Sequence, residues 1–452
     1  MRLWLSTRTI EISLRGRRKT IVCLVVLLVP VMALSVAILR ETVAQSLGES
    51  LRPAWIEAGL RLDPNQPALH HRLGMIRFYS TDHPDATGGL RLLRHAVKMQ
   101  PKSAPYWRDL ASACAATGDT ACADRAFQRA VALNPMSPGL HWVIANYDLE
   151  MNRTEAGFAE FKRLLNLDPG YSGSVFHMCL QMDIDDGVVW NKIVDGNRHF
   201  RVPVEWIKTL AGEGRLDDAY RAWREEMRSL AEPQVVTRQI SYADVRPFLD
   251  SLIQPHWGRK AEAVWSDLGR IGLVHAGRTA SRQANLIFNG DFEHNPLNSG
   301  FDWQLTPASS IMISREVGGP HGTSTLRIDF TPPANAAFEP VYEYVPVEPD
   351  QTYELSAQVK SQSITSDRGP QLRVADAFGD TRQLASTPGM TGTSTWQQVR
   401  VTFRTGPETR FVKISVWRAR SRAFPFDISG AFWLTSVCLQ PVHSMQAASE
   451  MR

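Results

Sequence analysis

The chain has 452 residues, of which 43% are hydrophobic and 21% charged, so it is too long for one ordinary domain and too apolar for a disordered protein. Its formal charge of +4 arises at the N-terminus, because residues 1–19 alone contribute +5 and the rest of the chain sums to −1. This balance argues against a nucleic-acid-binding protein, which needs a basic face on a folded domain.

An apolar segment follows the basic stretch. Residues 20–39 read TIVCLVVLLVPVMALSVAIL, which at the helical rise is long enough to cross a bilayer core. The positive flank predicts a cytoplasmic tail at residues 1–19, with the bulk of the chain in the periplasm or outside the cell. We therefore predict a single-pass signal anchor in a bacterial inner membrane. A cleaved signal peptide is the alternative, since Ser35-Val36-Ala37 fits a small-x-small cleavage site.

A short motif that ends in proline recurs through the next part of the chain. Leucine or methionine, one further residue and proline occur together at Pro64, Pro101, Pro135 and Pro169, at spacings of 37, 34 and 34 residues. A period near 34 is typical of stacked helical hairpins, and proline ends a helix because it lacks a donor and clashes with the preceding turn. We predict such an array over residues 40–275, regular to about residue 170 and degenerate after it.

The most complete repeat lies between residues 104 and 137. Its small and large apolar positions are Trp107, Leu110, Ala111, Ala123, Phe127, Ala130 and Pro135. This part resembles the tetratricopeptide family, whose stacked hairpins bind protein partners. The resemblance implies a partner-binding arm, and a plain spacer is the alternative that the sequence leaves open.

Two cysteines flank one predicted helical turn. Cys114 and Cys122 lie on either side of Thr117-Gly118-Asp119, so they could face each other across the hairpin. The spacing resembles the disulfide-bonded helical repeats of some secreted bacterial proteins, and an exported chain would permit the bond. Two small buried thiols are the alternative. We expect no cofactor, since no cysteine has zinc-ligand spacing.

From Asn285 onward, helical periodicity gives way to alternation bounded by glycine, proline and asparagine. We predict an antiparallel two-sheet sandwich over residues 285–442, after a linker at 276–284 and before a tail at 443–452. The opening NGDFE and the closing ISGAFWLTSVCL resemble the carbohydrate-binding, galactose-binding-like jelly-roll family. The complete fold class is thus one membrane helix, an all-α solenoid and an all-β sandwich.

The resemblance implies a glycan site, and aromatic residues on a polar strand face are the cue for it. Trp417 is the best candidate, because it alternates with Lys413 and Ser415 opposite an apolar face. The remaining candidates for glycan contact are Arg418, Tyr342, Glu343, Tyr344, Asp376 and Phe424. Either face of the VYEYV segment could be the inner one.

Related sandwiches often carry a structural calcium ion, which makes Glu293 in the opening a weak candidate ligand. The partner position in the last strand, where that family has an aspartate, is Thr435 here. A neutral hydroxyl is a poor ligand for a hard cation, so we expect no metal.

The motifs that mark common catalytic sites are missing from the sequence, including G-x-S-x-G, H-E-x-x-H and a phosphate loop. We therefore expect a non-catalytic, exported scaffold. The layout is similar to bacterial tetratricopeptide proteins associated with exopolysaccharide or O-antigen assembly, with fold analogy as the only warrant. The alternative is an architectural module of an envelope complex that binds protein and no sugar.

Overall fold

The structure is a computed structural model that describes residues 17–50, 52–81, 85–230, 233–275, 285–332, 337–379, 383–424 and 426–442. The predicted linker, the predicted C-terminal tail and residues 1–16 lie outside these ranges. Within them the expected fold class is confirmed, with an apolar first helix, helical hairpins and an antiparallel two-sheet sandwich. The chain divides into two compact units, Met1–Asp168 and Pro169–Arg452.

Helix α1, Arg17–Gly48, contains the apolar segment. Among the described residues, its stretch Leu24–Gly48 is the one long and apolar enough to cross a membrane, with a mean hydropathy of 2.2. Length and composition fit a signal sequence equally well. The last turns of α1 belong to the arm, because Ala44 is buried in one apolar cluster with Ile56 and Leu69. The C-terminal end of the apolar helix therefore packs against the first helices of the arm.

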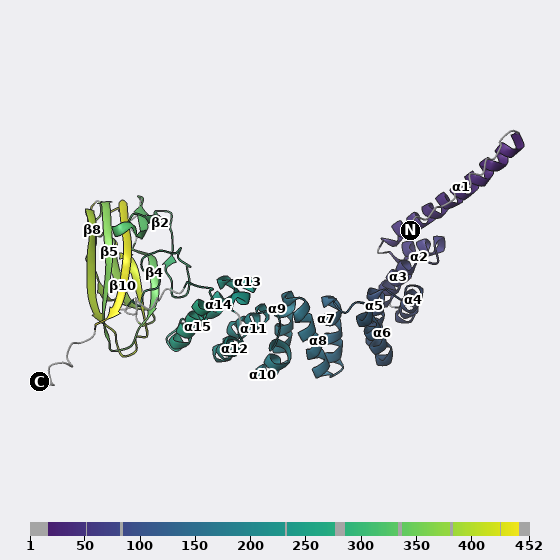
Figure 1. Ribbon diagram of the computed structural model, residues 1–452, viewed down its shortest axis with the longest axis horizontal. Helices are drawn as coiled ribbons and strands as arrows, with labels where there is room; N and C mark the ends of the chain where they lie inside the picture. Colours follow the sequence, from purple (N-terminus) through teal and green to yellow (C-terminus); the bar gives the residue numbers. More distant parts are fainter. Residues whose placement is uncertain are drawn as a thin grey trace, which may run out of the picture. The chain divides into compact units, whose positions relative to one another are not determined.

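The rest of the first unit consists of paired helices that follow the predicted period (Figure 1). The helices are α2 Pro53–Leu62, α3 Pro67–Tyr79, α4 Ala86–Met99, α5 Ala104–Ala116, α6 Thr120–Leu133, α7 Pro138–Glu150 and α8 Thr154–Leu167. Aspartates cap two of the second helices: Asp85 accepts from the Gly88 amide and Asp119 from the Cys122 amide. Helices α4 and α6 each end just before one of the recurring prolines, as the sequence pattern predicts.

The helices of the second unit are less regular. They are α9 Ser172–Gln181, α10 Asp186–Val189 followed by a π-turn at Trp190–Val194, α11 Arg201–Gly212, α12 Leu216–Ser229, α13 Pro233–Gln239, α14 Tyr242–Leu252 and α15 Gly258–Arg270. A buried tryptophan joins two of them, since the Trp223 indole of α12 donates to Asp267 of α15 at 3.0 Å. Degenerate sequence here corresponds to helices of unequal length that still pack on one another.

The sandwich contains two sheets of five strands within the described ranges. The strands are β1 Gln304–Leu305, β2 Ile311–Val317, β3 Ser324–Phe330, β4 Phe338–Pro346, β5 Thr352–Ile364, β6 Gln371–Asp376, β7 Gln383–Ser386, β8 Gly392–Arg404, β9 Phe411–Arg418 and β10 Gly430–Pro441. Sheet A has the order β1-β4-β9-β6-β7 and sheet B has the order β2-β3-β10-β5-β8; Figure 1 shows β8, β5 and β10 of sheet B side by side.

The apolar core lies between the two sheets. Leu326 and Ile328 of β3 and Ile414 and Val416 of β9 are fully buried there, and Trp303 completes it near the opening of the domain. Because side chains alternate along each strand, the residues between these positions lie on the outer face of each sheet. The outer face of sheet A is the place to look for the predicted glycan contacts.

Candidate functional site

Strand β9 presents Trp417 outward as the alternation predicts. Val412, Ile414 and Val416 are fully buried on the core side, while Lys413 and Trp417 on the other side are partly exposed. Ser415 lies between them but is fully buried, because neighbouring side chains cover its hydroxyl. The outer face of β9 therefore places a hydroxyl between an ammonium group and an indole.

Strand β4 adds two tyrosines beside β9. Tyr342 pairs with Ser415 and Tyr344 pairs with Lys413, and both tyrosines are half-buried on the outer face. Glu343 points the other way and is 1% exposed, with Oε1 accepting from the Phe288 amide at 2.9 Å. The expectation that Glu343 faces a ligand is therefore corrected: the core-side face of VYEYV carries the glutamate.

A carboxylate joins the middle of this face. Glu339 reaches it from an irregularity in β4, and its carboxylate accepts from Lys413 Nζ at 2.5 Å and from Ser415 Oγ at 2.7 Å. Arg373 of β6 approaches the same carboxylate at 3.6 Å. Partial burial favours the neutral acid, but these donors outweigh it and lower the pKa of Glu339. Glu339 is therefore a charged tether between two cations.

We use the name sheet A face for Glu339, Tyr342, Tyr344, Arg373, Lys413, Ser415 and Trp417. Aromatic rings lie at both ends of the polar centre. Trp417 is at one end of β9, and Tyr344 lies at the other end, beside Lys413. Lys413 and Trp417 are four residues apart along the strand, which is about 13 Å. The cations contact these rings: Arg373 lies 5.3 Å from the Trp417 centroid and Lys413 lies 4.2 Å from the Tyr342 centroid. The side chains of the face are thus held in place by one another.

Arg373 was not among the predicted site residues. Its strand reads QLRVAD, in which a single arginine between buried Leu372 and Val374 is an ordinary surface residue by pattern alone. The pairing of β6 with β9, which sets Arg373 opposite Ser415, is what brings it into the face. Strand order in a sheet of this kind is not readable from the alternation within one strand.

The other predicted contacts lie outside the sheet A face. Arg418 is fully buried, and its guanidinium donates to the Arg368 carbonyl at 2.8 Å and to Ser366 Oγ at 2.9 Å. Arg418 also donates to the Phe426 carbonyl at 3.2 Å, so it holds two loops together. Its full burial corrects the prediction that it contacts a glycan. Asp376 accepts from the Phe378 and Gly379 amides in a turn, which is a capping role. Phe424 is 89% exposed on the loop before β10.

The position at which related sandwiches often carry calcium does not fit a calcium ion here. Thr435 is buried and donates to the Ser324 carbonyl at 2.7 Å, so its oxygen serves a strand contact. The guanidinium of Arg315 contacts the backbone carbonyls of Phe292 and Glu293 at 2.6 and 2.7 Å. A cationic side chain beside these oxygens is unfavourable for a second cation.

The tryptophan of β10 in sheet B differs from Trp417. Trp433 is only 5% exposed, because Arg327 and Lys360 lie over the ring at 5.1 and 4.6 Å and the indole donates to Glu316. A covered indole offers no surface for stacking on a ligand. Trp433 is therefore a poorer candidate than Trp417.

A charged groove of about 470 Å³ lies on the arm between α6 and the α7–α8 hairpin. Arg153 holds Asp124 at 2.7 Å, and Tyr147 donates to the same carboxylate at 2.9 Å. Beneath the groove, buried His141 contacts Glu160 at 2.5 Å, which raises the pKa of the imidazole. Such a surface, with fixed charges of both signs, suits a charged peptide.

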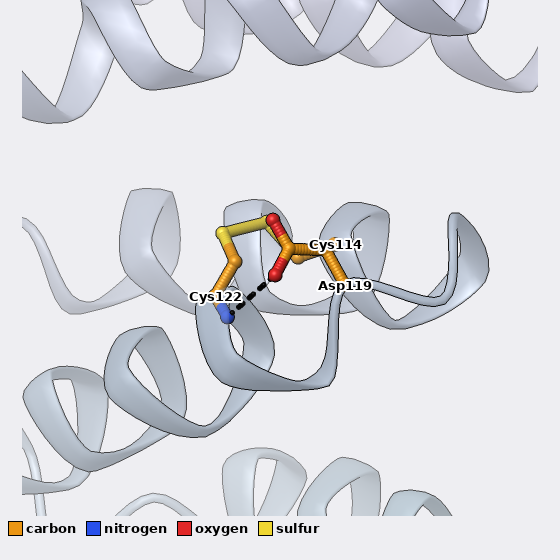
Figure 2. A group of neighbouring side chains, drawn as sticks. All are labelled: Cys114, Asp119 and Cys122. Carbon is orange, nitrogen blue, oxygen red and sulfur yellow. Dashed lines mark hydrogen bonds between the residues drawn. A yellow bond between two sulfur atoms is a disulfide. The ribbon is translucent and has the colours of Figure 1, made fainter.

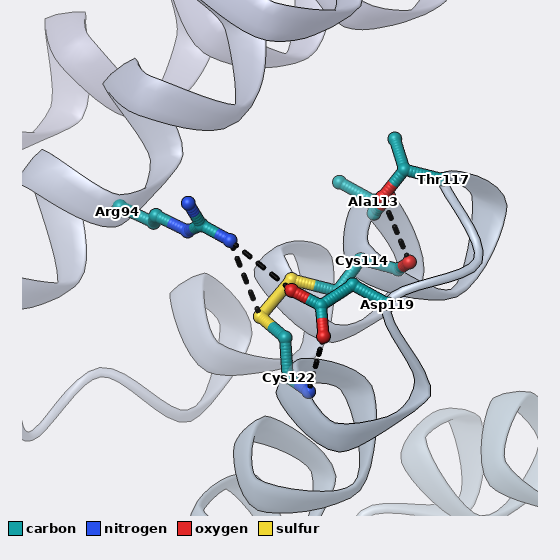
Figure 3. The surroundings of a disulfide bond; sticks show 6 residues. All are labelled: Arg94, Ala113, Cys114, Thr117, Asp119 and Cys122. Carbon is teal, nitrogen blue, oxygen red and sulfur yellow. Dashed lines mark hydrogen bonds and ion pairs between the residues drawn. A yellow bond between two sulfur atoms is a disulfide. The ribbon is translucent and has the colours of Figure 1, made fainter.

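The two cysteines of the α5–α6 hairpin are bonded. The Sγ–Sγ distance is 2.08 Å and the Cα–Cα distance is 5.8 Å. Figure 2 shows that Asp119 lies beside the bond between Cys114 and Cys122. Metals bind thiolates, and a disulfide has none, so this group does not fit a metal ion in the bonded state. In Figure 3, Arg94 approaches Asp119 at 3.4 Å, which places a cation beside the bond.

A second cavity, of about 300 Å³, lies where α15 meets the sandwich. Trp265, Phe288 and Phe301 form its apolar wall, with Glu262 and Arg270 among its polar lining. The Trp265 ring packs edge-on against Phe288 at 4.9 Å. The cavity joins the helical and β parts of the second unit and was not predicted from the sequence.

No family model and no curated protein matches the chain. Similar solved structures include a CBM4, with 16% identity over 34% of this chain and 99% of that one and a TM-score of 0.28. A MamA protein has 16% identity over 42% of this chain and 91% of that one, with a TM-score of 0.28. The CBM22-1–GH10 modules of a Clostridium thermocellum xylanase, complexed with xylohexaose, have 13% identity over 35% and 29%, with a TM-score of 0.25. Likenesses this remote carry no functional conclusion.

Proposed function

We propose that the protein is a non-catalytic, membrane-anchored, exported scaffold whose sheet A face binds glycan and whose helical arm binds a protein partner. The observation that carries the glycan site is the arrangement of partly exposed Trp417, Tyr342 and Tyr344 around hydrogen-bonding side chains on one outer face. The alternation of rings and polar groups supports a ligand with both apolar and hydroxyl-bearing surfaces.

The chemistry of a sugar fits these groups. The C–H face of a pyranose ring packs on an aromatic plane, and its hydroxyls need donors and acceptors close by. Here the partly exposed Lys413 ammonium donates to the Glu339 carboxylate, and a sugar hydroxyl can hydrogen-bond to either group. The rings and charges are already fixed by mutual contacts, which reduces the entropy lost when a ligand binds.

The arm and the anchor complete the proposal. The charged groove between α6 and α8 supports protein binding by the arm, and the exposed apolar part of α1 supports anchoring in a membrane. A place in exopolysaccharide or cell-envelope polysaccharide assembly, with the bulk of the chain in the periplasm, is the finer form of the proposal. It rests on the analogy of layout described for the sequence.

A glycan array probed with the full detergent-solubilised chain tests the sugar site. We expect binding of at least one glycan class, and we expect Trp417→Ala to weaken it by about tenfold or more, the loss of roughly one stacking contact. Trp396→Ala is the matched control, because Trp396 is a half-buried tryptophan on sheet B. Glycan binding that survives Trp417→Ala unchanged, or the absence of any binding, contradicts the site.

The exposed loop before β10 favours the second candidate function, a purely protein-binding module. Phe424 and Phe426 are 89% and 46% exposed and pack edge-on at 6.0 Å, so together they form a small apolar projection. If the array shows no glycan binding, while Phe424→Ala removes an envelope protein captured by the wild-type chain, this second function replaces the first.

A further inference from the structure

The sheet A face has more positive than negative charge. Arg373 and Lys413 are its cations, and Glu339 is its one carboxylate among the described side chains of the face. Glu343 does not change this balance, because its side chain points into the sandwich. The Asp250 carboxylate of α14 also acts electrostatically on Tyr342, but it pairs with Arg246 at 3.4 Å, so the sheet A face keeps a net charge of +1.

Partial burial makes this excess charge effective. The side chains of Arg373 and Lys413 are 20% and 24% exposed, and Glu339 is 24% exposed. Charges that are largely shielded from water interact more strongly than charges on long, fully solvated side chains. The Glu339 carboxylate holds both cations near Trp417 and Tyr342, where stacked sugar rings would place their substituents.

The loops that follow the Trp417 end extend the positive surface. Arg420 and Arg422 are exposed on the loop after β9, and Arg368 is 63% exposed on the loop before β6. Asp367 and Asp427 oppose them. Asp367 contacts Ser421 and lies 3.8 Å from Arg368, and the charges of both acids act on buried Arg418. Buried Arg418 donates to a backbone carbonyl in each loop, so the backbone that carries Arg368, Arg420 and Arg422 is held in place.

We propose that the sheet A face selects glycans that carry an anionic substituent, with Arg373 and Lys413 contacting the anion while Trp417 and the tyrosines pack on the sugar rings. The inference rests on the proposed glycan site and specifies its ligand class. A uronic-acid carboxylate and a sulfate ester share the necessary chemistry, namely oxygen acceptors of negative charge. A planar guanidinium can bind either group with two parallel hydrogen bonds.

Binding of three soluble probes to the full detergent-solubilised chain tests the proposal by calorimetry. The probes are an oligogalacturonate, a sulfated chondroitin oligosaccharide and neutral xylohexaose. We expect an anionic probe to bind at least tenfold more tightly than the neutral one, and we expect its affinity to fall as NaCl is raised from about 50 to 300 mM. The two anionic arms distinguish a carboxylate from a sulfate.

Charge variants assign the effect to the face. Arg373→Gln and Lys413→Gln should each lower the anionic affinity about tenfold, whereas Lys413→Arg, which keeps the charge, should retain most of it. Arg400→Gln is the matched control, since Arg400 is 58% exposed on β8 of sheet B. Circular dichroism of each variant establishes that the sandwich remains folded.

The possible outcomes separate this inference from the proposed function. Equal binding of neutral and anionic probes that is lost in Trp417→Ala overturns the charge selection and leaves the glycan site standing. Failure of every probe and of the array overturns both. Anionic binding that ignores Trp417, Arg373 and Lys413 also overturns both, because the ligand then binds elsewhere.

Discussion

At the scale of single residues, Asp302 shows how the acids near the opening of the β domain are used. Its side chain is 1% exposed and accepts from the Leu297 and Trp303 amides, each at 2.8 Å. Burial nevertheless outweighs these hydrogen bonds and raises its pKa to about 6. The Asp302 carboxylate therefore closes the loop before buried Trp303 by accepting from two of its backbone amides, which is a structural role.

The raised pKa of Asp302 predicts a pH-dependent stability. The folded protein holds the proton more tightly than the unfolded chain, so this contribution is complete below about pH 4 and is lost as the pH rises through about 6. The Asp302→Asn side chain does not titrate, so the variant does not lose this contribution. As the pH rises from about 4 to above 6, its free energy of unfolding should therefore increase by about 2–3 kcal/mol relative to that of the wild type. Urea unfolding at several pH values measures the difference. A difference that is constant with pH would show that the pKa of Asp302 is the same in the folded and unfolded states.

The glycan candidates show how far residue patterns reach. Alternation around Trp417 was sufficient to predict its outward face, because one side of β9 is uniformly apolar. Around Tyr342 both sides of the strand are mixed, so the sequence left the inner face open and the structure places Glu343 there. Arg418 follows Trp417 at the strand end and falls on the core-side alternation of β9, so it is buried with the adjoining loops.

At the scale of elements, the α5–α6 hairpin is closed at its turn by a covalent bond. Cys114 lies near the end of α5 and Cys122 near the start of α6, eight residues apart in the sequence. The bond restricts the unfolded chain and therefore favours the hairpin. The 34-residue period was sufficient to predict the hairpin. The disulfide also requires the two cysteine side chains to face each other, and the spacing in the sequence does not decide this.

Removal of this disulfide should destabilise the arm by about 2.5 kcal/mol, as expected for so short a loop in the chain-entropy view. Cys114→Ser with Cys122→Ser makes the change, and thermal unfolding followed by circular dichroism measures it. Reductant should reproduce the effect in the wild type and have no further effect in the double variant. Cys179→Ser provides a control for the loss of a buried thiol outside the bond. Equal melting of oxidised and reduced wild type would contradict a stabilising role.

At the scale of the whole molecule, the change in sequence pattern and the division of the structure fall at different places. Alternation begins near residue 285, but the second compact unit begins at Pro169 and includes the last helices. Tyr242 of α14 bonds Ser299 at 2.7 Å, and Gly258 of α15 leaves no room for a side chain because Phe411 lies 2.7 Å from the position of a Cβ. Contacts between distant segments of this kind have no periodic signal in the sequence. The sheet A face therefore belongs to a compact unit that includes the last helices as well as the sandwich.

This junction predicts that the last helices and the start of the sandwich are stabilised together. Trp265 of α15 packs against Phe288 at 4.9 Å and against Phe301 at 5.7 Å, so Trp265→Ala removes the shared wall of the junction cavity. Truncation of a half-buried tryptophan should cost about 2–3 kcal/mol, which corresponds to hydrogen exchange faster by roughly 30- to 150-fold. We expect this increase both in the α15 peptide and in the peptide that contains Phe288 and Phe301. Trp190→Ala, in an earlier helix of the same unit, should leave the latter peptide unchanged. Faster exchange confined to α15 would mean that the sandwich does not depend on the helices, because its own core then suffices to hold residues 285–303.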